Sequence, residues 1–198
     1  RQASGSAAYE ASVGFRAGAP DVTVTSDLRG LAFDLPAPLT KRAEAAWPLR
    51  FQSGPQAGEA GRERLHLAVA DQLALDYELD TSARPARVLR GTVGIGPQAT
   101  AGLALPAAGV TGRLRLPALD VDAWDAAAER LLGSEASAIS GTSTGAATSP
   151  ADRAFLPSAW SLRVDELHVD DRVLHEVASD GTREGATWRA DVQARELA

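Results

Sequence analysis

The sequence predicts a mainly β protein in which a curved antiparallel sheet forms an open groove and carries one short α-helix. Three observations favour this fold class. Apolar and polar residues alternate over most of the chain, one segment changes to a helical spacing, and aromatic residues make up only 5% of the composition. Alternation places apolar side chains on one face of a strand and polar side chains on the other. Strands of this kind are typical of antiparallel sheets with one face in water.

The strands are expected where this alternation is regular. It covers residues 9–16, 22–29, 65–69, 73–80, 89–95 and 110–116. In the last third, Trp160, Leu162 and Val164 form one apolar row. The phase then changes at Asp165-Glu166, which predicts a β-bulge. Turns at 170–171 and at 179–181 complete an expected three-stranded meander from 160 to 194.

One segment breaks the alternation. Apolar residues between 124 and 132 recur at helical spacing, and Asp122 stands before them as a candidate N-cap. We therefore expect a helix over Ala123–Leu132 that covers one end of the sheet. The organisation predicted is a β-groove segment over 1–132, a flexible loop rich in Ser, Thr, Gly and Ala over 133–150, and a meander over 151–198 that continues the groove.

Composition excludes several classes of function. The chain has 198 residues, no cysteine and a net charge of −6. Without cysteine there is no disulfide, thiolate nucleophile or thiolate metal site. A nucleic-acid binder normally shows a basic face, and none is evident, so no nucleic-acid partner is expected. Because the chain has no methionine, even at its start, we expect a fragment or a processed product.

No residue pattern indicates catalysis, a cofactor or a metal. Asp76, Glu78 and Asp80 share one strand face, and an acid/base role there would make the chain a hydrolase. Strict alternation with apolar residues instead favours a solvated sheet face. His168 and Asp170 also share a face, but no third metal ligand is evident. We therefore predict a protein that is not an enzyme and that has no catalytic, cofactor or metal site.

The apolar rows are the feature left to explain. A sheet with one apolar face must cover it with a second layer or with a ligand. Either the face carries a hydrophobic ligand, or the chain is a structural spacer or a protein-interaction domain with a self-packed core. Whether other parts of the protein cover the rows decides between these hypotheses.

Several motifs resemble the AsmA-like proteins of Gram-negative bacteria, most closely the YhdP branch. Within 26–39 a strand leads into Gly-Leu-x-x-Asp-Leu-Pro-x-Pro-Leu, and Pro-Leu-Arg follows at 48–50. Residues 112–124 are similar to the family's strand that leads into Leu-Asp-x-Asp-x-Trp and a helix. Residues 162–169 with Trp188 resemble its recurring meander. Thr40 departs from the pattern, because a Gly is expected there to turn the chain.

The resemblance implies a lipid-transfer function. Such proteins are anchored in the inner membrane, extend across the periplasm, and are thought to carry phospholipid toward the outer membrane in an apolar groove. The expected partners are phospholipid acyl chains, with membrane contact through other parts of a parent chain and possible self-association through exposed strand edges. The expected groove-lining residues are Leu65, Leu67, Val69, Leu73, Leu75, Tyr77, Leu79, Leu89, Val93, Ile95, Val110, Leu114 and Leu116.

Overall fold

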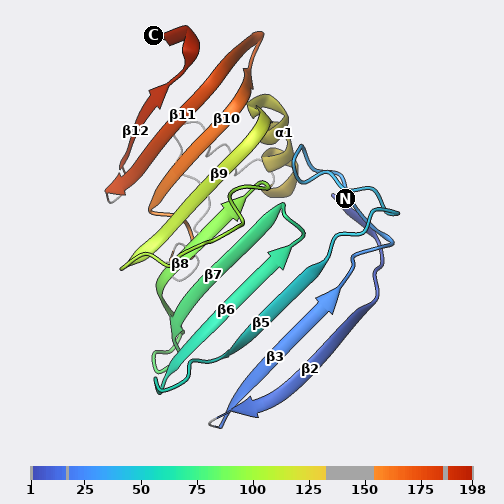
Figure 1. Ribbon diagram of the computed structural model, residues 1–198, viewed down its shortest axis with the longest axis vertical. Helices are drawn as coiled ribbons and strands as arrows, with labels where there is room; N and C mark the ends of the chain where they lie inside the picture. The colour runs from blue at the N-terminus through green and yellow to red at the C-terminus, as the bar shows by residue number, and fades with distance from the viewer. Residues whose placement is uncertain (1, 17, 133–153, 185–186, 198) are drawn as a thin grey trace.

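The computed structural model describes residues 2–16, 18–132, 154–184 and 187–197. Ten strands form one open sheet in the order β12-β11-β10-β9-β8-β7-β6-β5-β3-β2 (Figure 1). The predicted mainly β, open sheet with one short helix is confirmed for these residues. The segment predicted as a flexible loop, 133–150, lies outside them.

Most strands match the alternating segments, but the one expected over 22–29 ends at residue 26, and β5 was not predicted. The strands of the large sheet are β2 Tyr9–Arg16, β3 Ala19–Ser26, β5 Leu49–Pro55, β6 Arg62–Val69, β7 Leu73–Asp80, β8 Arg87–Ile95, β9 Gly109–Asp120, β10 Ala159–Val169, β11 Arg172–Glu184 and β12 Thr187–Gln193. Outside it lie β1 Ala3–Gly5, which pairs with β4 Leu31–Phe33, the helix α1 Val121–Leu132, and a short 3-10 helix, η2, at Arg195–Leu197.

The sheet has two chemically different faces. Leu67 of β6 lies opposite Leu75 of β7, and the adjacent row pairs His66 with Asp76. We call the side that carries Leu67 and Leu75 the apolar face, and the side that carries His66 and Asp76 the polar face. Both faces extend from β2 to β12, because in each pair of neighbouring strands the apolar row of one strand lies opposite the apolar row of the other.

Two strand pairs, β8–β9 and β9–β10, are parallel, whereas an antiparallel sheet was predicted throughout. Parallel neighbours need a crossover connection. The first crossover, residues 96–108, runs over the polar face, where a Cβ on Gly94 would come 2.3 Å from the carbonyl oxygen of Ala99. The second contains α1, and both α1 and residues 155–158 lie over the apolar face. The first has no regular alternation or helical spacing, so its path was not evident from the sequence.

The helix begins two residues earlier than predicted. Asp120 is its cap, since its Oδ1 accepts a hydrogen bond of 2.8 Å from the backbone amide of Ala123. Asp122, the predicted cap, lies inside the helix. Its carboxylate accepts a 2.8 Å hydrogen bond from the amide of Asp170 in the β10–β11 turn. It therefore fastens the helix to the sheet.

The irregularity predicted at Asp165 involves more than one strand. Asp165 is paired with neither neighbouring strand, although the residues opposite it are Pro117 on β9 and Glu176 on β11. Glu176 has a φ of 53°. Each register is unchanged beyond this point. The three strands therefore depart from regular pairing together at one level, instead of one strand having an extra residue opposite regular neighbours.

The turn predicted at residues 179–181 is wrong, because β11 continues straight through it to Glu184. The reason is packing on the apolar face. The Trp160 ring lies over Gly181, and a Cβ at that glycine would come 2.2 Å from the indole nitrogen. Gly181 therefore makes room for a ring and does not turn the chain.

Candidate functional site: the apolar face and its covered end

The apolar face is most exposed on β2. Tyr9, Val13 and Phe15 are 70%, 63% and 79% exposed, and all eight residues of the strand are exposed. The strand is at the edge of the sheet, and no other strand among the described residues pairs with its outer side. On β3, β5 and β6 the apolar row is mostly half-buried. We call β2, β3, β5 and β6 the open part of this face.

Farther along the sheet, other segments cover the apolar face. The Tyr77 hydroxyl donates a 2.8 Å hydrogen bond to the carbonyl oxygen of Phe155, and the two rings meet edge to face at 5.3 Å. Ser158 bonds to the backbone of Val110. Beneath this segment, Tyr77, Leu79 and Val110 form a buried cluster. Burial also raises the pKa of the Tyr77 hydroxyl.

The helix α1 covers the same face at the other end of these strands. It leaves a recess of about 260 Å³ between itself, the sheet and the loop after β4. Trp124 donates its indole N–H to the carbonyl oxygen of Ala37, 2.9 Å away, so the polar edge of the ring is satisfied. The recess is lined by Pro38, Leu39, Ile95, Leu114, Leu116, Leu119, Val121, Trp124 and Asp125.

A buried lysine braces the loop that bounds this recess. Lys41 is 3% exposed, and its ammonium donates to the carbonyl oxygens of Leu28, Leu31 and Arg42 at 2.7, 2.7 and 3.2 Å. Gln2 also bonds to the carbonyl oxygen of Ala127 in α1. The N-terminal segment and the helix are thus held against each other, as they lie in Figure 1.

The register places twelve of the thirteen predicted lining residues on the apolar face, which is continuous from β6 to β9. The exception is Leu89, which lies at a register shift, so that Val88 takes the position opposite Leu79. This describes where the residues are; their role in lining a lipid path stays a prediction.

Sequence reasoning missed part of the same face. Phe51 lies opposite Leu67. Phe51 lies in a segment without regular alternation, so the sequence did not predict which face of the sheet it would occupy. Leu119, Val121 and Trp124 join the recess only because the chain turns from β9 into α1.

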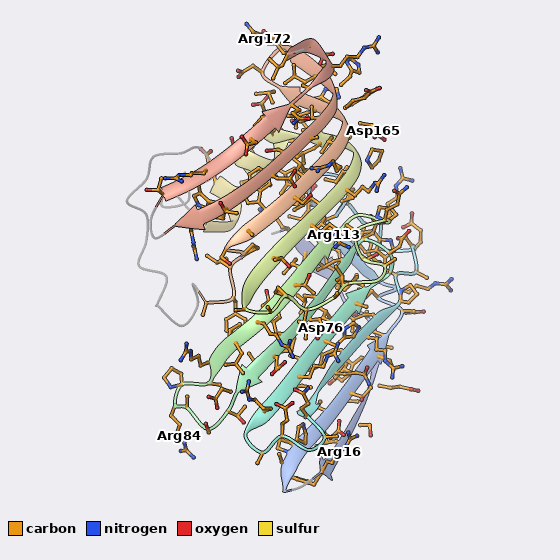
Figure 2. All side chains as sticks on the ribbon, turned by 60° about the vertical axis from the view of Figure 1, so that its left-hand side comes forward. Arg16, Asp76, Arg84, Arg113, Asp165 and Arg172 are labelled. Atoms are coloured by element: carbon orange, nitrogen blue, oxygen red, sulfur yellow. The ribbon has the colours of Figure 1, made fainter. Side chains whose placement is uncertain are left out.

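The polar face carries a network of ion pairs. Arg64 donates hydrogen bonds to both carboxylate oxygens of Asp76, at 2.8 and 2.5 Å. The carboxylate of Glu78 accepts hydrogen bonds from Arg62 at 3.1 Å and from Arg90 at 2.6 Å. The hydrogen bond to Asp76 raises the pKa of Arg64. Figure 2 shows charged side chains along the whole sheet, with Asp76 near its middle.

The prediction that these carboxylates are solvated is wrong. Asp76 and Glu78 are only 5% and 4% exposed, because arginines from the neighbouring strands cover them. Each carboxylate is bound by a permanent cation, which makes it a structural group. His66 lies 3.7 Å from Asp76 in the same network.

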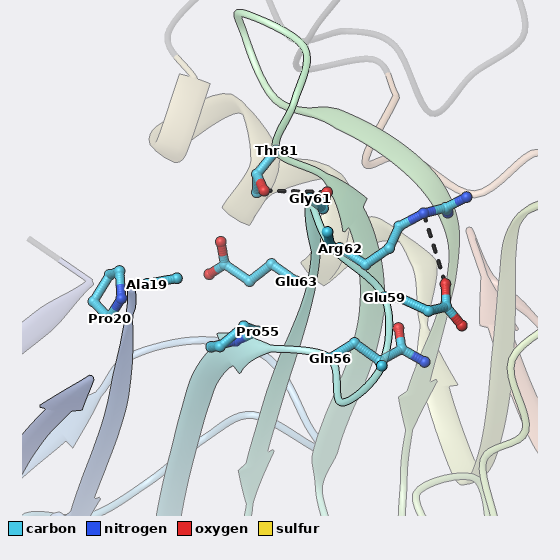
Figure 3. Close-up of a pocket in the computed structure, with 11 residues that line it drawn as sticks. Ala19, Pro20, Pro55, Gln56, Glu59, Gly61, Arg62, Glu63 and Thr81 are labelled. Atoms are coloured by element: carbon cyan, nitrogen blue, oxygen red, sulfur yellow. Dashed lines mark hydrogen bonds and ion pairs between the residues drawn. The ribbon is translucent and has the colours of Figure 1, made fainter. Parts of the chain in front are cut away.

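At the end of the sheet opposite α1, the apolar face ends in a charge. Glu63 lies in the row of Leu79 and Pro55, and it accepts a hydrogen bond from the Ser53 hydroxyl. Figure 3 shows Glu63 pointing toward Ala19 and Pro20 across a pocket of about 390 Å³. The two ends of the face therefore differ: one is a pocket that holds a carboxylate, the other an apolar recess.

His168 and Asp170, which share a strand face, contact different groups. His168 lies 3.8 Å from Glu166, and the amide of Asp170 is bound by Asp122. Within the described ranges, no group of three or more His, Asp or Glu is placed to hold a metal ion. In the same ranges, no helix has the length and apolar character needed to cross a membrane.

The fold and its two faces define an amphipathic β-sheet protein whose largest feature is an extended apolar surface. The family model described as YhdP protein matches residues 1–198, the whole chain. The chain belongs to the YhdP family, a family of transport proteins, which confirms the resemblance seen in its motifs. No curated protein and no solved structure matches it significantly.

Proposed function

We propose that this chain is a segment of an envelope protein that carries phospholipid between the inner and outer membranes of a Gram-negative cell, with the acyl chains on its apolar face. The observation that carries the proposal is the continuity of that face across ten strands, with large apolar side chains exposed on β2. Membership of the YhdP family supports it. In this role the chain works in the periplasm without catalysis or a cofactor.

The physical basis is the cost of hydrocarbon in water. Each exposed CH₂ group costs about 0.8 kcal/mol, and an apolar sheet face removes that cost without requiring a shaped pocket. The polar face, with Asp76 and Glu78 neutralised by arginines, keeps the other side of the sheet compatible with water. Such a surface holds chains of any length, which suits a conduit better than a selective binding site.

The proposal can be tested with a matched pair of substitutions on β6. Leu67 and Ala68 are adjacent and both half-buried, but they lie on opposite faces. The purified chain is incubated with phosphatidylethanolamine vesicles that contain tritiated lipid, then separated from them. We expect retained lipid on the wild type and on Ala68→Asp, and several-fold less on Leu67→Asp. Thermal melting checks that both variants remain folded.

The second candidate is a structural spacer with a self-packed core. The cover that α1 and Phe155 give to part of the apolar face favours it. In that case the folded wild type retains no lipid above the level of a control protein, and the lipid proposal is rejected.

A further inference from the structure

We infer that the recess under α1 holds the methyl end of a single hydrocarbon chain, so that the recess gives a bound lipid one defined orientation. This inference rests on the proposed function and specifies it, because it assigns one end of the face to one end of the ligand.

The lining of the recess is almost entirely apolar. Eight of the nine residues around the recess are apolar, and they come from the loop after β4, from the sheet and from α1. The one side-chain N–H group among them, that of Trp124, already donates to the carbonyl oxygen of Ala37. Asp125 is the one lining side chain with a polar group not already bonded in this way, and a single carboxylate offers no donor to a phosphate or carboxylate head group.

The negative charge in the lining favours the entry of one end of a lipid over the other. Asp125 is the only ionised lining residue, and its negative charge disfavours a phosphate or carboxylate. A methyl terminus carries no charge and has no hydrogen bonds to lose on entry. Burying it against Leu116 and Trp124 removes apolar surface from water on both partners.

The recess is also in line with the rest of the apolar face. Ile95, one of its lining residues, lies opposite Leu73, which lies opposite Val69, which lies opposite Leu49. This row connects the recess with the open part of the face. At the other end of the strands the face ends at Glu63, beside a pocket of about 390 Å³. Gln56, Arg62 and Thr81 also line this pocket and offer hydrogen bonds to a polar group.

Trp124 itself provides the measurement, since bromine quenches tryptophan fluorescence on contact. The probes are two fatty acids, one brominated near its methyl end and one beside its carboxyl group. The proteins are the wild type, Trp124→Phe, and Trp188→Phe as the control. Trp188 is 48% exposed and lies on β12, away from the recess. Retention of a tritiated fatty acid measures binding independently.

We expect the methyl-end bromines to quench the wild type and Trp188→Phe more than the carboxyl-end bromines do, and this difference to disappear in Trp124→Phe. Equal quenching by both probes, or retained fatty acid without any loss of Trp124 fluorescence, would overturn the recess inference and leave the proposed function standing. If no variant retains fatty acid while the fold is intact, both the inference and the proposed function are wrong.

Discussion

At the scale of single residues, buried charges show how this sheet stays ordered with so little aromatic core. Asp76 and Glu78 lie under arginines from the flanking strands, and Lys41 lies inside a cage of carbonyl oxygens. A buried charge is tolerated only when it is paired or fully hydrogen-bonded. These groups therefore fix the register of β6 to β8 and the path of the N-terminal loop.

Lys41 allows a direct test, because it is the only lysine in the chain. An amine-reactive reagent should label the N-terminal amine and leave Lys41 unmodified in the native protein. Both should be labelled in urea. Lys41→Met should lower the free energy of unfolding by about 2 kcal/mol, because three carbonyl oxygens lose a donor. Rapid native labelling of Lys41, read by peptide mass spectrometry, would show that the lysine is not enclosed.

The second residue-scale prediction concerns pH. The backbone amide and the ring of His175 hydrogen-bond to Glu196 at 2.9 and 2.7 Å, and these bonds hold the pKa of Glu196 below its ordinary value of 4.5. A lowered pKa in the folded state means that the contact stabilises the fold above pH 4.5. This stabilisation is lost as the pH falls through the lowered value.

We therefore expect the hydrogen-exchange protection factor of the His175 amide to fall as the pH drops below 4.5. In Glu196→Gln it should be nearly independent of pH in that range, whereas Glu10→Gln on the exposed β2 should behave like the wild type. Protection that is constant with pH in the wild type would contradict a structural role for this contact.

At the scale of elements, periodicity predicted the strands well because each face of the sheet has a single character. The alternation at 73–80 gave the correct faces for β7, since Leu75 and Asp76 could not exchange faces without burying the wrong residues. What failed depended on other elements. The burial of Asp76 needs Arg64 from β6, and the straight path of β11 needs the Trp160 ring over Gly181.

The glycine under Trp160 gives the element-scale prediction. In Gly181→Ala the added Cβ would be 2.2 Å from the indole nitrogen, so the ring or the strand must move. We expect a loss of about 1–3 kcal/mol in the free energy of unfolding, measured by urea denaturation. Gly14→Ala is the control, because its Cβ would meet nothing closer than 3.9 Å. Equal stability of the two variants would mean that Trp160 does not pack there.

At the scale of the whole molecule, the candidate site could be predicted only in part. The apolar rows of β6 to β9 were readable from the sequence, because they depend on local alternation. The recess was not, since its walls come from residues 38–39, 95, 114–121 and 124–125, which are brought together by a crossover. The parallel pairing of β9 with both neighbours has the same origin, because the path of a crossover is a property of the fold and not of a local segment.

The exposed edges of the sheet lead to a prediction about association. β2 and β12 are the outer strands, and all their residues are exposed. Unpaired edges with an apolar face tend to pair with other chains, and an inward-facing lysine prevents this. We expect concentration-dependent self-association of the wild type in sedimentation velocity. Ala11→Lys, on the apolar side of β2, should reduce it more than Ser12→Lys on the polar side. A wild type that sediments as a monomer at all concentrations would contradict this expectation.

Photo-crosslinking in living cells can show whether lipid lies on the apolar face of the folded sheet, with benzoylphenylalanine in place of Phe51 or Gln52. These neighbours are both half-buried on β5 and lie on opposite faces, beside Leu67 and His66. We expect phospholipid adducts at Phe51 and none at Gln52. Equal lipid labelling at both positions, or protein adducts alone at Phe51, would contradict this placement of the lipid.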